Sequence, residues 1–327
     1  MRKYLFITLT LLITMFSCVN KRVGSFGEDV ELTAIELPIN GVEIFPLHIM
    51  LLDDKLVLLS YNSPDNVFYI FSLPDMELLN IAGRKGRGPR EITQLPIFGN
   101  SLYDKFLYIT GYSSGEVIKW DIDNDGTLVY VENIEIGNAA TNLCIMDGVA
   151  YYTNLDKRVI EKVDINNGEI LGSIPMPDRE ISMRQTGGFG ANREILVFAH
   201  AFGSNNIDIY NPINLKKIKT IRTNPVIRQY VNSAERENII TCYTHVMVGQ
   251  NGFYAIYSGK SSTNPDKSRY LEVYDNSGNP VKRYHINRHM HSFIVDEVNN
   301  CVYGVNYGEV DVILKYDLKG TSNKYQK

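Results

Sequence analysis

The sequence has few cysteines and no clear helical patterns. The first shortage argues against a disulfide-rich domain, and the second argues against a helical fold. Four cysteines occur among 327 residues, and beyond Cys18 they are the widely separated Cys144, Cys242 and Cys301. Three isolated cysteines in apolar runs do not make the paired framework of a disulfide-rich exported domain. We therefore expect buried free thiols, with no metal or redox role. The absence of long amphipathic helix patterns favours an all-β fold.

The chain also lacks a strong charge of one sign. Its formal net charge is −4, and basic residues form no broad cluster, so nucleic acid is not an expected partner. The chain contains 21 tyrosines and 13 phenylalanines but only one tryptophan. Aromatic rings pack well on pleated sheets, and this composition again favours strands.

The N-terminus begins with "MRKYLFITLTLLITMFSC". Arg2 and Lys3 precede an apolar core, residues 4–16, that is too short to span a bilayer, so residues 1–17 are predicted to be a signal peptide. The cysteine that follows predicts lipid attachment at Cys18, which would hold the exported protein on the outer membrane, on its periplasmic or surface side. Ordinary secretion with an unmodified Cys18 is the alternative. Residues 18–29 are predicted to form a polar tether.

One pattern recurs six times and organises the chain. Each copy contains a strand that ends on an apolar or aromatic anchor, then a polar turn and a further strand. The turns contain Asp, Asn, Gly or Pro, the residues that tight hairpins require. Steps of 49, 43, 47, 64 and 42 residues separate the anchors, which are Phe71, Trp120, Val163, Tyr210, Tyr274 and Tyr316. With two strand patterns upstream of each anchor, the sequence predicts a six-bladed β-propeller with four antiparallel strands, a to d, in each blade.

The sixth repeat ends at "DVILKYDLKG" and lacks an outer strand d. The segment "VELTAIELP", residues 30–38, alternates as a strand does, so we expect it to pair with residues 310–317 and complete the last blade. One propeller domain then spans residues 30–320, followed by a polar tail, 321–327. Residues 229–237 could form a short helix in an insertion between blades four and five, and residues 258–269 form a polar loop within blade five.

The loop "GRKGRGPRE", residues 83–91, follows the last strand of the first blade. It lacks the Gly-Lys-Ser/Thr ending of a phosphate-binding P-loop and the strand–turn–helix context of a dinucleotide site. Its glycines suit a tight connection to the second blade. Four cations project from it and are the predicted contacts for an anionic ligand or partner: Arg84, Lys85, Arg87 and Arg90. A purely structural connector with solvated charges is the alternative.

This "G-x-x-G-x-G-P-x-E" loop, in a six-bladed propeller behind a lipoprotein-type signal, resembles the TolB-like six-bladed propeller lipoproteins of Bacteroidetes-type bacteria. It is also similar to the linker of NHL-repeat propellers. Arg90 stands where such loops usually carry glycine. The resemblance implies an exported, anchored propeller with a binding role and supplies no catalytic residues.

Histidines are predicted near the start of three innermost strands: His48, His245 and His291, with His289 on the same connection as His291. They fall in the first, fifth and sixth blades, which neighbour one another in a closed ring, so they are expected at the channel mouth. Three converging imidazoles are zinc-type ligands in principle, whereas polar channel-lining histidines are the plainer interpretation. No metal site or cofactor is predicted.

The sequence favours a non-enzymatic, monomeric binding or scaffold propeller of the cell envelope whose loop-rich face contacts a protein or glycan. The alternative is a metal-dependent hydrolase or lactonase with its site in the channel. A calcium-dependent enzyme needs six to eight oxygen ligands. The predicted innermost strands contain few acidic residues, and no Gly-x-Ser-x-Gly motif occurs.

Overall fold

The computed structural model describes residues 25–319, apart from residues 40–41, 61–62, 89, 93–95, 112–114, 137–139, 155, 177–186, 203, 223–238, 262, 265–269 and 307. Cys18, the predicted signal peptide and the polar tail lie outside the described residues, as does the predicted short helix at 229–237. In the part of the chain that the structure describes, no helix has the length and apolarity to cross a lipid bilayer.

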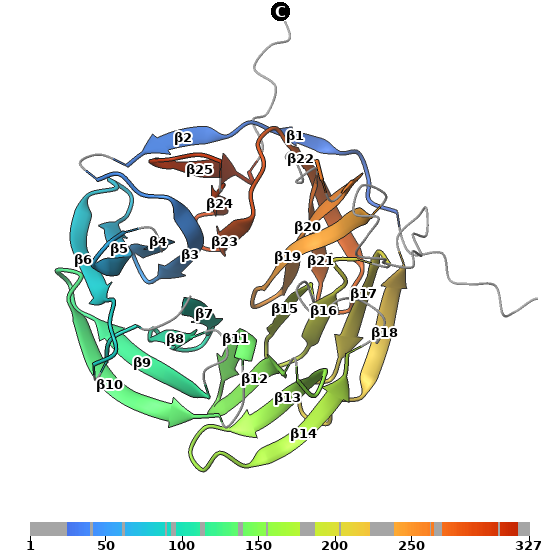
Figure 1. Ribbon diagram of the computed structural model, residues 1–327. Coiled ribbons are helices and arrows are strands. Elements are labelled where there is room, and N and C mark those ends of the chain that lie inside the picture. The colour runs from blue at the N-terminus through green and yellow to red at the C-terminus, as the bar shows by residue number, and fades with distance from the viewer. Residues whose placement is uncertain are drawn as a thin grey trace, which may run out of the picture.

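The described residues form 25 strands, arranged as six blades around a central axis (Figure 1). The first three blades consist of β3 (Pro46–Leu52), β4 (Lys55–Ser60), β5 (Asn66–Ser72) and β6 (Leu78–Arg84); β7 (Pro96–Asn100), β8 (Leu107–Gly111), β9 (Glu116–Ile122) and β10 (Leu128–Glu135); and β11 (Ala140–Met146), β12 (Val149–Asn154), β13 (Val159–Asp164) and β14 (Ile170–Pro175).

Blades four to six follow the same order from the axis outward. They consist of β15 (Gly188–Ala191), β16 (Leu196–Ala199), β17 (Asn206–Tyr210) and β18 (Lys217–Arg222); β19 (Ile240–Val248), β20 (Gly252–Ser261), β21 (Tyr270–Asp275) and β22 (Pro280–Ile286); and β23 (Ser292–Asp296), β24 (Cys301–Val305) and β25 (Val312–Asp317). Consecutive strands of a blade are antiparallel, which confirms the predicted six-bladed propeller.

The last blade is completed by the N-terminal segment, but only by half of the predicted strand. β2 (Ile35–Pro38) pairs antiparallel with β25, with Ile35 opposite Lys315. β1 (Val30–Leu32) instead pairs in parallel with β22 of blade five, so the prediction that all of residues 30–38 lies beside blade six is wrong for its first part. The chain passes from the rim of blade five to that of blade six, because Leu32 packs into the core between these two blades.

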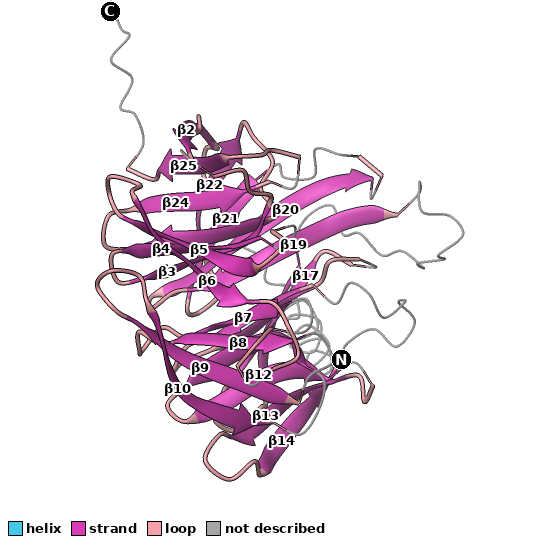
Figure 2. Cartoon of the chain, turned by 60° about the vertical axis from the view of Figure 1, so that its left-hand side comes forward, coloured by secondary structure: helices cyan, strands magenta, loops and turns pink. Residues whose placement is uncertain are grey.

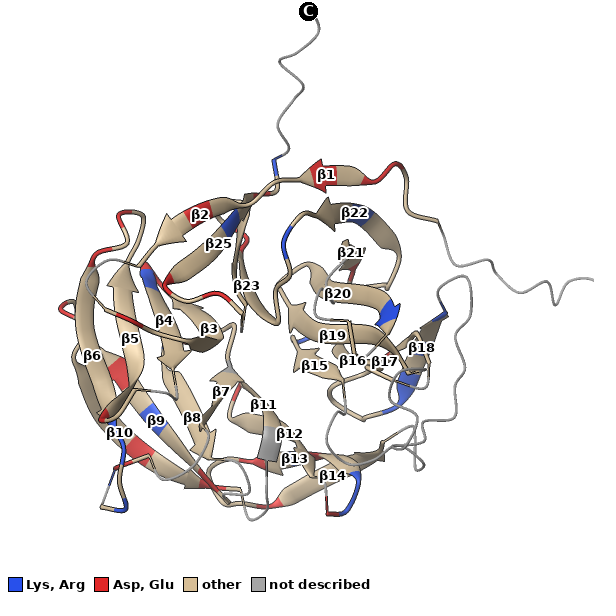
Figure 3. Cartoon of the chain, turned by 45° about the horizontal axis from the view of Figure 1, so that its top comes forward, with Lys and Arg blue, Asp and Glu red and all other residues tan. Residues whose placement is uncertain are grey.

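Charge complementarity fixes this N-terminal strap, residues 26–38, to the rim. Figure 3 shows acidic residues on β1 and β2 and basic residues on β22 and β25. Asp29 forms an ion pair with Arg283 at 2.7 Å, and Glu31 pairs with His285 at 2.7 Å. These pairs are partly exposed and contribute little individually. Together with the burial of Leu32, they explain why β1 stays on blade five.

The core lies between neighbouring blades. Each of six apolar clusters joins two adjacent blades, and one of them joins blade six to blade one through residues such as Tyr303 and Leu58. The six predicted anchors all lie on third strands and are at most 8% exposed. Cys144, Cys242 and Cys301 are buried free thiols, as expected. Figure 2, a view from another side, shows strands and loops in the described part.

Blades two and three are also joined by hydrogen bonds between their innermost strands, because β11 pairs in parallel with β7. Gly99 permits this approach, since a Cβ at this position would lie 2.7 Å from the side chain of Leu143. Strands of adjacent blades are therefore in contact at the axis, where the candidate site lies.

Candidate functional site

The loop-rich face holds the connections from strand d to the next strand a and those from strand b to strand c, since successive strands reverse direction. The loop from Arg84 to Ile92 lies on this face, between blades one and two. Its ends are held by backbone hydrogen bonds, with Lys85 N donating to Asp65 O at 2.8 Å and Ile92 N donating to Arg84 O at 2.9 Å. The loop is thus fastened to blade one.

Glu91 organises the tip of this loop. Its carboxylate accepts a hydrogen bond from Gly88 N at 2.7 Å. A Cβ at position 86 would lie 1.8 Å from Oε2 of the same carboxylate, so a larger residue there would displace the Glu91 side chain. The loop is therefore a structured connector, as the sequence suggested, and its side chains project from a fixed backbone.

The four predicted contact residues differ in their availability. Arg84 forms an ion pair with Glu91 at 3.4 Å, yet its side chain is 79% exposed. Lys85 donates from Nζ to the carbonyl oxygen of Ser63. Arg87 is exposed, with no ion pair to the residues that the structure describes. Arg90 stacks its guanidinium 4.0 Å from the centre of the Tyr130 ring. Three of the four cations thus contact other groups of the protein, although Arg84 is still largely exposed.

Arg90 adopts the left-handed conformation, with φ at 66°, in which glycine is favoured. We expect Arg90→Gly to be more stable than Arg90→Ala by about 1 kcal/mol, because both variants lose the stacking on Tyr130 and only alanine retains the backbone strain. Urea unfolding of the two variants measures this difference directly. An alanine variant as stable as the glycine variant would contradict the strain.

A cavity of about 100 Å³ lies at the axis on the inner strands, and a smaller cavity of about 30 Å³ adjoins it. All six blades contribute to the larger cavity. Its lining comprises His48, Ile49, Ile97, Phe98, Asn142, Leu143, Gly187, Gly188, Phe189, Thr244, His245, Val246, Met247, Ser292, Phe293 and Ile294. A water molecule needs about 10–15 Å³ on this measure, so the larger cavity has room for several waters or one small molecule.

Two of the predicted histidines line this cavity, and a third, His291, lies within electrostatic range of both. His48 and His245 line it, and His291 donates from Nε2 to the carbonyl oxygen of Leu47 at 2.6 Å. Burial lowers the pKa of His48 and of His245 to about 4, with the charge of His48 a further cause at His245. Burial also lowers the pKa of His291 to about 3, and His289 adds a smaller effect. All three imidazoles are therefore uncharged at neutral pH.

The surroundings of the histidines do not resemble a metal or acid–base centre. Within the described ranges, no three side chains of His, Cys, Asp or Glu are grouped to hold a metal ion. No aspartate or glutamate is among the residues that line the larger cavity. Among the described residues, the lining of the channel thus offers uncharged hydrogen-bonding groups beside aromatic rings.

Sequence reasoning missed a set of buried acids in blades three to five. Each lies two residues before an anchor: Glu161, Asp208 and Glu272, which are 2–3% exposed. An alignment of the repeats on their anchors would have shown an acidic residue two positions before the anchor in three of the six repeats. Tyr243 and Tyr274 donate to Glu272 at 2.9 and 2.7 Å.

The pKa directions of these acids follow from their partners. Burial raises the pKa of Glu272 above its usual value, since only tyrosine hydroxyls oppose it strongly. Burial acts in the same direction on Glu161, but hydrogen bonds, first from Lys157 and then from Tyr152, bring its pKa below the usual value. The blades thus stabilise the charged form of Glu161 and oppose ionisation of Glu272.

Blade four contains a serine, a histidine and an aspartate in contact. His200 lies 3.0 Å from Ser204 through Nδ1 and 3.2 Å from Asp208 through Nε2. Lys217 also contacts Asp208, at 3.0 Å. The sequence motif search did not detect this group. All three members are at most 9% exposed, and none of them is among the residues that line the axial cavity.

Comparison with known proteins agrees with the architecture. Residues 140–298 match the model of the TolB-like 6-blade propeller-like family, which confirms the resemblance over that part of the chain. The matched segment includes blades three to five, where the buried acids lie. No curated protein matches the sequence.

Solved structures with similar folds align over most of this chain. A streptogramin B lyase is 11% identical, with a TM-score of 0.55, and the alignment covers 89% of this chain and 99% of that one. U3-55K is 10% identical, with a TM-score of 0.52 and coverages of 86% and 98%. BamB from Moraxella catarrhalis is 13% identical, with a TM-score of 0.46 and coverages of 88% and 99%. At such identities the first two alignments show the fold alone.

Proposed function

We propose that this chain is a non-enzymatic binding propeller of the cell envelope, which contacts a protein or glycan partner through its loop-rich face. The observation that carries the proposal is the connection after β6, whose described residues are held by hydrogen bonds and on which Arg84 and Arg87 are exposed. A fixed backbone lowers the entropy cost of binding, and arginine forms paired hydrogen bonds with carboxylates. We therefore narrow the predicted contacts to these two arginines, with Lys85 and Arg90 supporting the loop.

An envelope location rests on the lipoprotein-type N-terminus, in which Cys18 would carry the anchor. The N-terminal strap supports this arrangement, since it fastens the start of the domain to blades five and six immediately after the predicted tether.

Reversing the charge of the exposed arginines should remove the partner. We expect the double variant Arg84→Glu with Arg87→Glu to capture at least tenfold less of the partner from an envelope extract than the unaltered protein. The matched control is Lys216→Glu with Lys319→Glu, two exposed lysines on turns of the opposite face. Equal capture by the arginine variant, or equal loss in the control, would overturn the assignment of the contacts.

A further inference from the structure

The channel differs in character between its two ends. The larger cavity lies on the side of the loop-rich face and carries His48, His245, Thr244 and Asn142. The smaller cavity, towards the opposite face, is lined mainly by apolar side chains. Met247 and Ile294 line both cavities, so the two adjoin.

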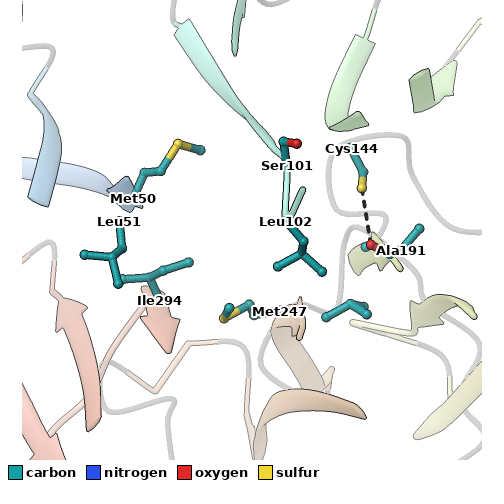
Figure 4. A pocket seen from close by; sticks show the side chains of 10 residues that line it. Met50, Leu51, Ser101, Leu102, Cys144, Ala191, Met247 and Ile294 are labelled. Atoms are coloured by element: carbon teal, nitrogen blue, oxygen red, sulfur yellow. Dashed lines mark hydrogen bonds between the residues drawn. The ribbon is translucent and has the colours of Figure 1, made fainter. Parts of the chain in front are cut away.

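Leu102 forms the floor of the channel. It belongs to the turn between β7 and β8 of blade two, yet it packs against the core between blades five and six, on the other side of the axis. Figure 4 shows Leu102 beside Met247 in the smaller cavity, which Ile294 also lines. The next residue, Tyr103, is held by Arg193, whose guanidinium lies 4.1 Å from the ring centre and which also pairs with Asp147 at 2.7 Å. The floor is thus anchored by three blades.

One hydroxyl in the larger cavity lacks a partner. Thr244 Oγ1 is buried and makes no hydrogen bond to the residues that the structure describes. A buried hydroxyl without a partner costs free energy, which a bound polar group can recover. Beside it lie uncharged imidazoles with no aspartate or glutamate among the lining residues.

We propose that the larger cavity is a pocket for a small carboxylate, which is bound by His48, His245 and Thr244. A carboxylate supplies the counter-charge that this pocket lacks, so one imidazole takes a proton from solution and donates a charge-assisted hydrogen bond. A neutral molecule of the same shape gains no such ion pair. At the other end of the channel, turns between first and second strands carry acids such as Asp53, Glu194 and Glu297, which disfavours anion entry there.

The titratable groups that face this site are all imidazoles in the described part of the chain. His48 and His245 line the pocket, and His291 and His289 lie within electrostatic range of them. Because burial holds the pKa of the two lining histidines near 4, the proton must be taken up on binding at neutral pH. Carboxylate affinity should therefore fall about tenfold for each pH unit above this value, until the pKa of the bound state is passed.

The test is titration of the folded protein with acetate and with acetamide, which have the same size and differ in charge. We expect acetate to bind at least tenfold more tightly than acetamide at pH 5, with proton uptake in calorimetry and a rise in the pKa of one imidazole by NMR. Equal binding of the two probes, or a pH-independent acetate affinity, would overturn the proposal.

Variants of the lining residues distinguish acetate binding in this pocket from acetate binding to exposed charges elsewhere. Thr244→Val keeps the shape of the side chain and should weaken acetate binding several-fold, and replacing both His48 and His245 by Gln should abolish its pH dependence. The control His285→Gln alters an exposed imidazole on the outer rim and should leave binding unchanged. Tighter binding of N-acetylglutamate amide than of acetate would assign the carboxylate to a partner's side chain, whereas the reverse would assign it to a free acid. Both results support the pocket.

Discussion

A chain that begins at Ile39 should fail to form a soluble, cooperatively folded propeller. This truncation removes β2 as well as β1, so blade six is left with three strands, β25 becomes its exposed edge, and the seam between blades six and one loses the side chain of Leu37. Open edges pair with other chains, and a ring needs its last blade complete. Size-exclusion chromatography should find aggregates, and urea unfolding should lose its single sharp transition.

A shorter truncation provides the control for this result. A chain that begins at Thr33 keeps β2 and blade six but loses Leu32 and the pair between Asp29 and Arg283. We expect it to remain monomeric and folded, with a free energy of unfolding lower by about 2–3 kcal/mol from the burial of one leucine and small surface terms. If the chain from Ile39 were as stable as this control, the strap would not close the ring.

Replacing Asp208 by alanine should destabilise the protein by about 3–5 kcal/mol at pH 7. The substitution leaves His200, Lys217 and Thr220 without their shared buried acceptor in blade four. Urea unfolding measures the change. The control Glu169→Ala, at an exposed turn of blade three, should stay within about 0.5 kcal/mol of the unaltered protein.

The pH dependence of the same variant tests the cause. Burial opposes ionisation of Asp208, but hydrogen bonds from His200 and Thr220 lower its pKa to about 2. A carboxyl group with a lowered pKa contributes stability above its unfolded pKa, near 4, and loses it as pH falls towards 2. Asp208→Ala should therefore lose less stability than the unaltered protein between pH 4 and pH 2. Parallel pH profiles would show that the carboxylate does not act through its charge.

For the basic loop, residues 83–91, the local sequence predicted the course of the backbone but not the contacts of the side chains. Its glycines and its position after a fourth strand predicted a tight connector, and the positive φ of Arg90 agrees with the usual glycine at that position. The exposure of each cation was not predictable, because the contacts of Lys85 with Ser63 and of Arg90 with Tyr130 depend on neighbouring loops. The convergence of His48, His245 and His291 was predicted from the blade order alone.

The sequence by itself determined the six repeats, the buried anchors and the use of the N-terminus to complete the ring, because strand alternation and turn residues are local properties repeated along the chain. Only the tertiary structure decided that Val30–Leu32 lies on blade five, that Leu102 crosses the axis and that Asp208 gathers its partners. These features depend on contacts between side chains that are far apart in the sequence. A repeat pattern that describes only local strands and turns cannot predict such contacts.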